Sequence, residues 1–206
     1  MSAGLQIMAD SGNISLDSEM FNYSLISIND VACTYSRDKP SGFLTYSGIA
    51  PILVVYSPSG FVGLFEIIRN GDGSYTASFY TALSTFKAYV FDRVPQSSSG
   101  NIGFQTFNAS GDLIFDSGRK YLNVRGQATA SGITGQPTSN YGFAFTSLGV
   151  QFGGDVPNGL TNVLISCYRS RPDGVDISQS IVGVAPNYTQ GLIIPPTVCL
   201  VDLGRL

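Results

Sequence analysis

Histidine and tryptophan are both absent from the 206 residues of the chain. Without histidine, no Ser-His-Asp or Cys-His catalytic arrangement and no imidazole metal site can form. Glutamate occurs only at Glu19 and Glu66, and most aspartates adjoin Gly, Ser, Asn or Pro in turn-like stretches, which disfavours a pair of catalytic carboxylates in one cleft. We therefore expect a protein that is not an enzyme and that binds no cofactor and no metal.

Charge is also scarce, since charged residues make up 12% of the chain and the net charge is −3. Typical proteins carry about 25% charged residues. Nucleic-acid binding requires a basic patch that displaces counterions from phosphates, and the 11 lysines and arginines are scattered. Nucleic acid is therefore excluded as an expected partner.

Long hydrophobic runs are missing as well. The two longest, Ile49–Tyr56 and Gly191–Leu203, contain proline and fall short of the about 20 residues that a membrane span needs. The opening residues lack the basic start and apolar stretch of a signal peptide, so we expect synthesis in the cytoplasm and no membrane insertion. Three cysteines without a CxxC pair are expected to be buried thiols.

The residues that are abundant favour strands and turns. The chain has 24 glycines, 13 phenylalanines and 11 tyrosines, with many Ser, Thr and Asn residues and few Lys and Glu. Aromatic residues favour strands, whereas the scarce Lys and Glu favour helices. This composition predicts an all-β fold with almost no helix.

A repeated segment organises the chain: Gly4–Ser18 recurs as Gly103–Ser117, 99 positions later. Six of the 15 aligned positions are identical, namely Gly4/Gly103, Gln6/Gln105, Ser11/Ser110, Gly12/Gly111, Asp17/Asp116 and Ser18/Ser117. In each copy, apolar residues alternate on both sides of a central Ser-Gly, which predicts a β-hairpin. Gly12 and Gly111 are expected to hold the positive φ of the turn, and Asp17 and Asp116 to end the returning strand as structural turn residues.

The two halves also end alike, in Tyr89–Asp92 and in Val198–Asp202. Between them lies a stretch rich in Pro, Ser and Gly that is typical of a linker. We therefore predict two tandem β-sandwich-like domains related by internal duplication, the first at 1–95 and the second at 103–206, with a linker at 96–102.

Alternation and turn signals place further strands within each half. Apolar runs or alternation predict strands at Tyr23–Ile28, Val31–Tyr35, Ile52–Tyr56, Phe61–Arg69, Tyr75–Tyr80, Lys87–Asp92, Tyr121–Arg125, Tyr141–Thr146, Gly149–Phe152, Val163–Tyr168 and Val198–Asp202. The clearest tight-turn signal is Asn70–Ser74, which contains both Asn-Gly and Asp-Gly.

Two loops and one tyrosine are candidate contact sites. The segment Ser36–Gly42 concentrates charge, and Arg169–Gly174 is a second charged loop. The candidate interaction residues are Arg37, Asp38, Lys39, Tyr141, Arg169 and Arg171. Tyrosines near Gly-rich stretches could also stack on sugars, although aromatic rings at alternate strand positions are more often core residues.

The repeated motif G-[LF]-Q-x-x-[AN]-x-S-G-[ND]-x-x-[LF]-D-S, together with the ending Tyr89–Asp92, resembles small virion proteins of tailed bacteriophages that are encoded among tail-tip and tail-fibre genes. The resemblance covers 4–26, 86–93 and 103–125. It implies a structural component of the tail tip, baseplate or fibre attachment region, made in the host bacterial cytoplasm and located in the virion tail. Its partners would be other phage tail proteins, in a homo-oligomer with the symmetry of the tail, a trimer or a hexamer.

Two other functions remain open from the sequence. The first is a receptor-binding protein that recognises a surface glycan or an outer-membrane protein of the host cell. The second is an enzyme that degrades surface polysaccharide, which the scarcity of catalytic groups makes the more distant alternative.

Overall fold

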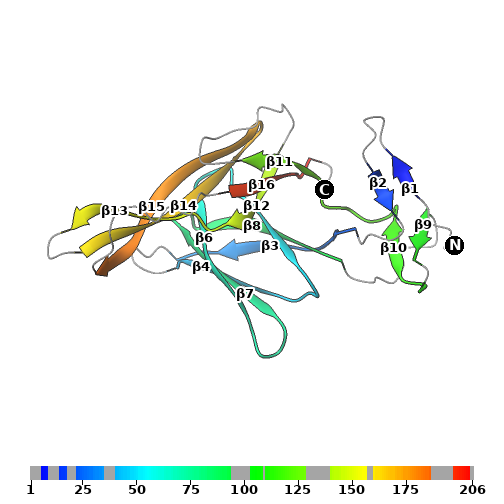
Figure 1. The fold of residues 1–206 in the computed structure, drawn as a ribbon, viewed down its shortest axis with the longest axis horizontal. Coiled ribbons are helices and arrows are strands. Elements are labelled where there is room, and N and C mark those ends of the chain that lie inside the picture. The colour runs from blue at the N-terminus through cyan, green and yellow to red at the C-terminus, as the bar shows by residue number, and fades with distance from the viewer. Residues whose placement is uncertain are drawn as a thin grey trace.

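The computed structural model describes residues 6–8, 14–17, 22–34, 40–93, 103–108, 110–128, 140–156, 160–186 and 197–204 (Figure 1). Every regular element in these ranges is a β-strand, and all named pairings are antiparallel. The prediction of an all-β fold is confirmed.

Six strands form one sheet, here called sheet I. Their order is β11 (Val124–Ala128), β16 (Thr197–Asp202), β12 (Tyr141–Ser147), β5 (Ile52–Tyr56), β8 (Thr85–Asp92) and β3 (Ser24–Ala32). The centre of the sheet is the pairing of β5 with β12, in which Val54 lies opposite Ala144. β5 is an apolar run with buried central residues, as its sequence predicts.

Sheet II contains the other six long strands. They are β4 (Gly42–Tyr46), β7 (Tyr75–Thr81), β6 (Val62–Arg69), β14 (Leu160–Arg171), β13 (Val150–Val156) and β15 (Gly174–Pro186). β15 pairs with β14 along its whole length, so β13 and β6 share the opposite edge of β14. β6 meets β14 at a single pair, Val62 and Tyr168.

The two sheets pack face to face around one hydrophobic core. The core takes Val55, Phe143 and Leu200 from sheet I and Phe79 and Tyr168 from sheet II. Aromatic rings bridge the layers, since the centroids of Phe143 and Tyr168 lie 5.6 Å apart. Burial of such rings is the main driving force for closing a sandwich of this kind.

Both halves of the sequence contribute to both sheets, which differs from the predicted division into two domains. Sheet I joins β5 to β12 and sheet II joins β6 to β14, so the boundary at 96–102 separates strands that pair with each other. The physical reason is that each half supplies only part of each sheet, and pairing with the other half covers its open strand edges. The linker itself lies outside the described residues.

The two copies of the repeated motif form small hairpins with the same register. These are β1 (Gln6–Met8) with β2 (Ile14–Asp17), and β9 (Gln105–Phe107) with β10 (Leu113–Asp116). The pairs are Gln6 with Asp17, Ile7 with Leu16 and Met8 with Ile14 in the first, and Gln105 with Asp116, Thr106 with Phe115 and Phe107 with Leu113 in the second. Every pair is displaced by 99 positions, and the register shift falls at the same step in both.

The same correspondence continues into sheet I. Leu25 pairs with Phe91 and, after a register shift, Ser27 with Val90; Val124 pairs with Val201 and, after a register shift, Gly126 with Leu200. The paired residues of β3 and β11 are 99 positions apart in the sequence, and those of β8 and β16 are 110 positions apart. The second offset is the one that aligns Asp92 with Asp202. The order β3-β8-β5 in one half therefore mirrors β11-β16-β12 in the other.

The main differences from the prediction concern four strands. β4, at Gly42–Tyr46, has no predicted counterpart, since no strand was predicted between Val31–Tyr35 and Ile52–Tyr56. β3 runs through to Ala32, so Val31–Tyr35 is not a separate strand within the described residues, and β11 starts at Val124 instead of Tyr121. β15 has no predicted counterpart, although its 13 residues make it the longest strand described. The polar run Ser178–Ser180 interrupts the alternation of apolar and polar residues that would predict a strand, because all three side chains are exposed to solvent.

Candidate functional site

The residues that recur in both motif copies fix the open end of the second hairpin. The amide of Gln105 donates to the carboxylate of Asp116 (3.0 Å), and the backbone N–H of Phe104 donates to Oγ of Ser117 (2.8 Å). Gly103 has a φ of 151°, and a Cβ there would lie 2.7 Å from Oγ of Ser117. Three of the six repeated identities thus take part in the hydrogen bonds of the hairpin base, and a fourth, Gly103, packs closely against the Ser117 hydroxyl.

The carboxylate of Asp116 is 2% exposed and also accepts from the backbone N–H of Gly118 (2.8 Å). The predicted role of Asp116 as a turn residue is consistent with these bonds. Beside it, the ring of Tyr121 stacks on Phe115 with centroids 4.9 Å apart. The hydroxyl of Tyr121 accepts from the backbone N–H of Asp116 (2.6 Å) and donates to its carbonyl (3.0 Å). The base of the hairpin is therefore rigid.

The turn of this hairpin follows the predicted chemistry. Gly111 has a φ of 85°, which confirms the positive φ expected there. Its N–H donates to the carbonyl of Asn108 (3.0 Å), and Oδ1 of Asn108 accepts from the N–H groups of Ser110 and Asp112. In the first hairpin, Gly12 lies outside the described residues, and Asp17 is described only by its backbone in β2.

Both hairpins project from the sandwich at the same end of its long axis, opposite the end reached by β14 and β15 (Figure 1). On the second hairpin, Phe104 is 50% exposed and Phe107 is 53% exposed. Their equivalents in the first copy are Leu5 and Met8, so the motif keeps apolar residues at both positions. This hairpin is therefore a protruding element with a rigid base and exposed aromatic rings.

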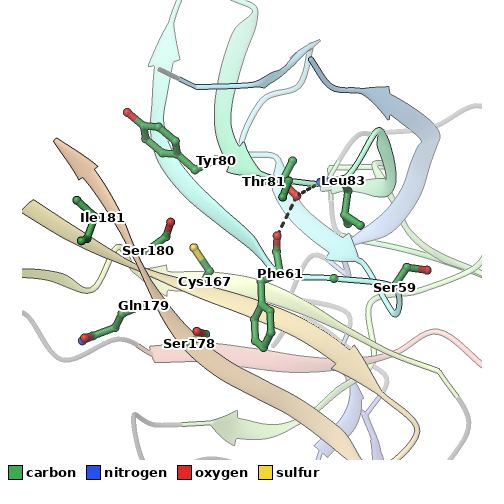
Figure 2. Close-up of a pocket in the computed structure, with 12 residues that line it drawn as sticks. Ser59, Phe61, Tyr80, Thr81, Leu83, Cys167, Ser178, Gln179, Ser180 and Ile181 are labelled. Atoms are coloured by element: carbon green, nitrogen blue, oxygen red, sulfur yellow. Dashed lines mark hydrogen bonds between the residues drawn. The ribbon is translucent and has the colours of Figure 1, made fainter. Parts of the chain in front are cut away.

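A second feature is a groove of about 730 Å³ on sheet II, on the face away from the core (Figure 2). One wall comes from the segment just before β6 and from the end of β7 with the residues that follow it, and the other wall comes from β15, with Cys167 of β14 between them. The residues that line it are Ser59, Gly60, Phe61, Tyr80, Thr81, Ala82, Leu83, Cys167, Ser178, Gln179, Ser180 and Ile181. The groove exists because β6 and β14 pair only at Val62 and Tyr168.

The floor of the groove is held by packing and by a cation on an aromatic ring. Tyr80, Cys167 and Val182 belong to one buried apolar cluster, against which Phe61 packs. The guanidinium of Arg169 lies 5.0 Å from the centroid of the Phe61 ring. Burial raises the pKa of the Cys167 thiol to about 12, so it stays protonated and is a poor nucleophile.

The polar groups around the groove fall into two sets. The hydroxyl of Thr81 is already engaged, because it donates its proton to the carbonyl of Phe61 (2.9 Å) and accepts from the N–H of Leu83 (3.1 Å). Three other hydroxyls, those of Ser59, Ser178 and Ser180, have no hydrogen-bond partner within the described part of the chain. These three can bind water or a ligand.

The predicted interaction residues do not share one site: one is buried in the core, two lie in an ion-pair network, and three lie outside the described residues. Tyr141 lies in β12, is 1% exposed and belongs to the core, so its prediction as an interaction residue is wrong for this chain on its own. The physical reason is that the chain after Asn140 enters the centre of sheet I, where alternate side chains face the core. Arg37, Asp38 and Lys39 lie outside the described residues.

Arg169 and Arg171 lie in β14 and belong to an ion-pair network. Nε of Arg169 donates to Asp176 (3.0 Å), and Arg171 pairs with both Asp176 (3.0 Å) and Asp173 (3.0 Å). Burial alone would raise the pKa of Asp176, but hydrogen bonds from the two arginines lower it. Arg169 also packs on Phe61, so it borders the groove. This groove was not predicted from the sequence, and the polar run Ser178–Ser180 was the only sequence feature that pointed to it.

Among the described residues, no three His, Cys, Asp or Glu side chains gather closely enough to hold a metal ion. The described part likewise includes no helix with the length and hydrophobicity of a membrane span. Comparison with known proteins finds no matching family model, no matching curated protein and no matching solved structure.

Proposed function

We propose that the protein is a structural component of the virion of a tailed bacteriophage, located at the tail tip, baseplate or fibre attachment region. The support is the resemblance of the repeated motif to small tail-associated virion proteins, together with the all-β fold. The protein acts through protein–protein contacts with other tail proteins. It assembles as a trimer or hexamer, because parts of a tail follow its rotational symmetry.

The protruding hairpin carries this proposal. Its base is fixed by the Gln105–Asp116 and Phe104–Ser117 hydrogen bonds, while Phe104 and Phe107 remain about half exposed. Aromatic residues are enriched at protein interfaces, and a rigid element loses little conformational entropy on binding. The hairpin is therefore suited to dock into a neighbouring tail protein.

We also propose that the chain arose by duplication of one unit. The matching registers of the two hairpins and of the first and last strands of each half support this. The two copies are related about an approximate two-fold axis through the Val54–Ala144 pair. Tyr23 and Leu122, 99 positions apart, face each other through a hydrogen bond (2.9 Å) and pack over the cluster that contains Val54 and Ala144.

Purified particles of the phage that encodes this chain provide the test. Mass spectrometry and immunogold labelling should detect the protein in the tail. A phage carrying Phe104→Ser with Phe107→Ser should incorporate much less of it, whereas Phe43→Ser, which changes a 60% exposed ring on β4, should incorporate normally. If the wild-type protein is absent from the particles, the proposal is refuted. If both variants are incorporated equally, the hairpin is not the contact that holds the protein in the tail.

A receptor-binding protein for a surface glycan is the second candidate function, and the groove on sheet II favours it. Purified protein would then bind host cells and compete with phage adsorption. Incorporation into virions without cell binding would leave only the first function.

A further inference from the structure

We propose that the groove between β15 and the β6–β7 wall is a binding site for a neutral oligosaccharide. This inference deepens the second candidate function and is independent of whether the protein is a virion component. It follows from three properties of the groove: its charge, its free hydroxyl groups and its apolar surfaces.

Neutrality is the first property. None of the 12 residues that line the groove is charged. Arg169, which lies on the ring of Phe61 beside the groove, is already bound to Asp176. A phosphate or carboxylate ligand would find no counter-charge here and would lose its hydration without compensation. The lining therefore selects against acidic ligands.

Free hydrogen-bonding capacity is the second property. Ser59 lies on one wall of the groove, and Ser178 and Ser180 lie on the other, on alternate positions of β15 that face the same side (Figure 2). Each hydroxyl both donates and accepts, as sugar hydroxyls do. The spacing of two residues along a strand sets Ser178 and Ser180 in a row, which suits a chain of hydroxyl-bearing rings.

Apolar surface is the third property. The side chains of Phe61, Leu83 and Ile181 line the same groove above the largely buried ring of Tyr80, and they offer apolar contacts for the C–H faces of sugar rings. The volume of about 730 Å³ lies within the about 300–1,000 Å³ of ordinary ligand sites. Hydroxyls and rings on one neutral surface are the combination that a saccharide requires.

The test is a titration of the full-length protein by NMR, with maltotriose, cellotriose, mannotriose and chitotriose as neutral probes and trigalacturonic acid as the acidic probe. At least one neutral trisaccharide should bind with a Kd of ~1 mM or tighter. Its affinity should fall about tenfold in Ser178→Ala with Ser180→Ala, because two hydrogen bonds are lost. Thr45→Val with Thr76→Val, which removes two hydroxyls from sheet II outside the groove, should leave the affinity unchanged.

Three results would overturn the proposal. One is that none of the four neutral probes binds, another is that trigalacturonic acid binds more tightly than all of them, and the third is that binding is equal in the Ser178/Ser180 variant and the wild type. Both variants have exposed or half-exposed sites, so circular dichroism should confirm that they fold. If no saccharide binds, the proposed role as a virion component is unaffected, because incorporation into virions is measured in a separate experiment.

Discussion

The buried carboxylate of Asp92 provides the sharpest prediction about stability. Asp92 ends β8 with no exposed surface, and its oxygens accept from the backbone N–H groups of Ile49 (2.6 Å), Ala50 (3.1 Å) and Arg93 (2.7 Å). The loop approaches so closely that a Cβ on Gly48 would lie 2.2 Å from Oδ2 of Asp92. The carboxylate therefore holds the loop that precedes β5 against the end of sheet I.

Asp92→Ala should lower the free energy of unfolding by about 3 kcal/mol. Each hydrogen bond to a charged group contributes ~1.5–3 kcal/mol. The variant loses two hydrogen bonds to the loop. The expected total lies at the low end of the range for two such bonds, because Ile49 is 56% exposed and water can reach its freed N–H group. For a chain of this size, a loss of about 3 kcal/mol lowers Tm by roughly 6–12 °C.

Urea denaturation followed by circular dichroism measures this change. The matched control is Asp30→Ala, which removes an exposed carboxylate that pairs with Lys87 (2.8 Å), and it should change the free energy of unfolding by at most ~0.5 kcal/mol. Gly48→Ala should also destabilise the protein. If Asp92→Ala unfolds within ~0.5 kcal/mol of the wild type, the carboxylate does not hold the loop and the reasoning fails.

Three further predictions concern single residues. Gly111→Val forces a β-branched residue to a φ of 85° and should cost about 1–2 kcal/mol locally, seen as faster hydrogen exchange in β9 and β10; unchanged exchange would contradict the turn assignment. Because burial raises the pKa of Cys167 to about 12, a thiol reagent at pH 8 should leave it unmodified in the native protein and label it only in urea, as mass spectrometry would show. The arginines lower the pKa of Asp176 below its unfolded value, so its contribution to stability is present above that value and is lost as pH falls through the folded pKa. Asp176→Asn should therefore lower the urea midpoint at pH 6, and the difference from the wild type should shrink as pH falls below the unfolded pKa; a difference that is as large in acid as at pH 6 would contradict the ion-pair explanation.

Local structure was predictable because its causes are local. Asn70–Ser74 forms the turn between β6 and β7, Gly111 takes a positive φ, and β5 is a buried apolar run, each from residues within one short segment. The repeated identities predicted a hairpin, although not the bond between Gln105 and Asp116 that closes its base. Patterning of this kind is visible without knowledge of distant contacts.

The arrangement of the halves was not predictable, because it depends on contacts between distant strands. A period of two says which face of β5 is buried but not that its neighbour is β12. For the same reason, Tyr141 was predicted as an interaction residue at the start of a strand, although its side chain lies in the core. The groove brings together segments far apart in the sequence, before β6, after β7 and in β15, and the polar run Ser178–Ser180 marks only one of its walls.

Cross-linking β5 to β12 tests most directly that the two halves complete one sandwich. With Cys33, Cys167 and Cys199 replaced, Val54→Cys and Ala144→Cys should form an intrachain disulfide on oxidation, because directly opposite residues of antiparallel strands are close enough to be bridged.

The matched control is Leu53→Cys with Val90→Cys, a pair within the first half that has the same place in the alternating hydrogen-bond ladder. Mass spectrometry of the monomer should find the cross-link in both variants. A disulfide in the control alone would show that β5 and β12 are not neighbours, and would contradict a single sandwich completed by both halves.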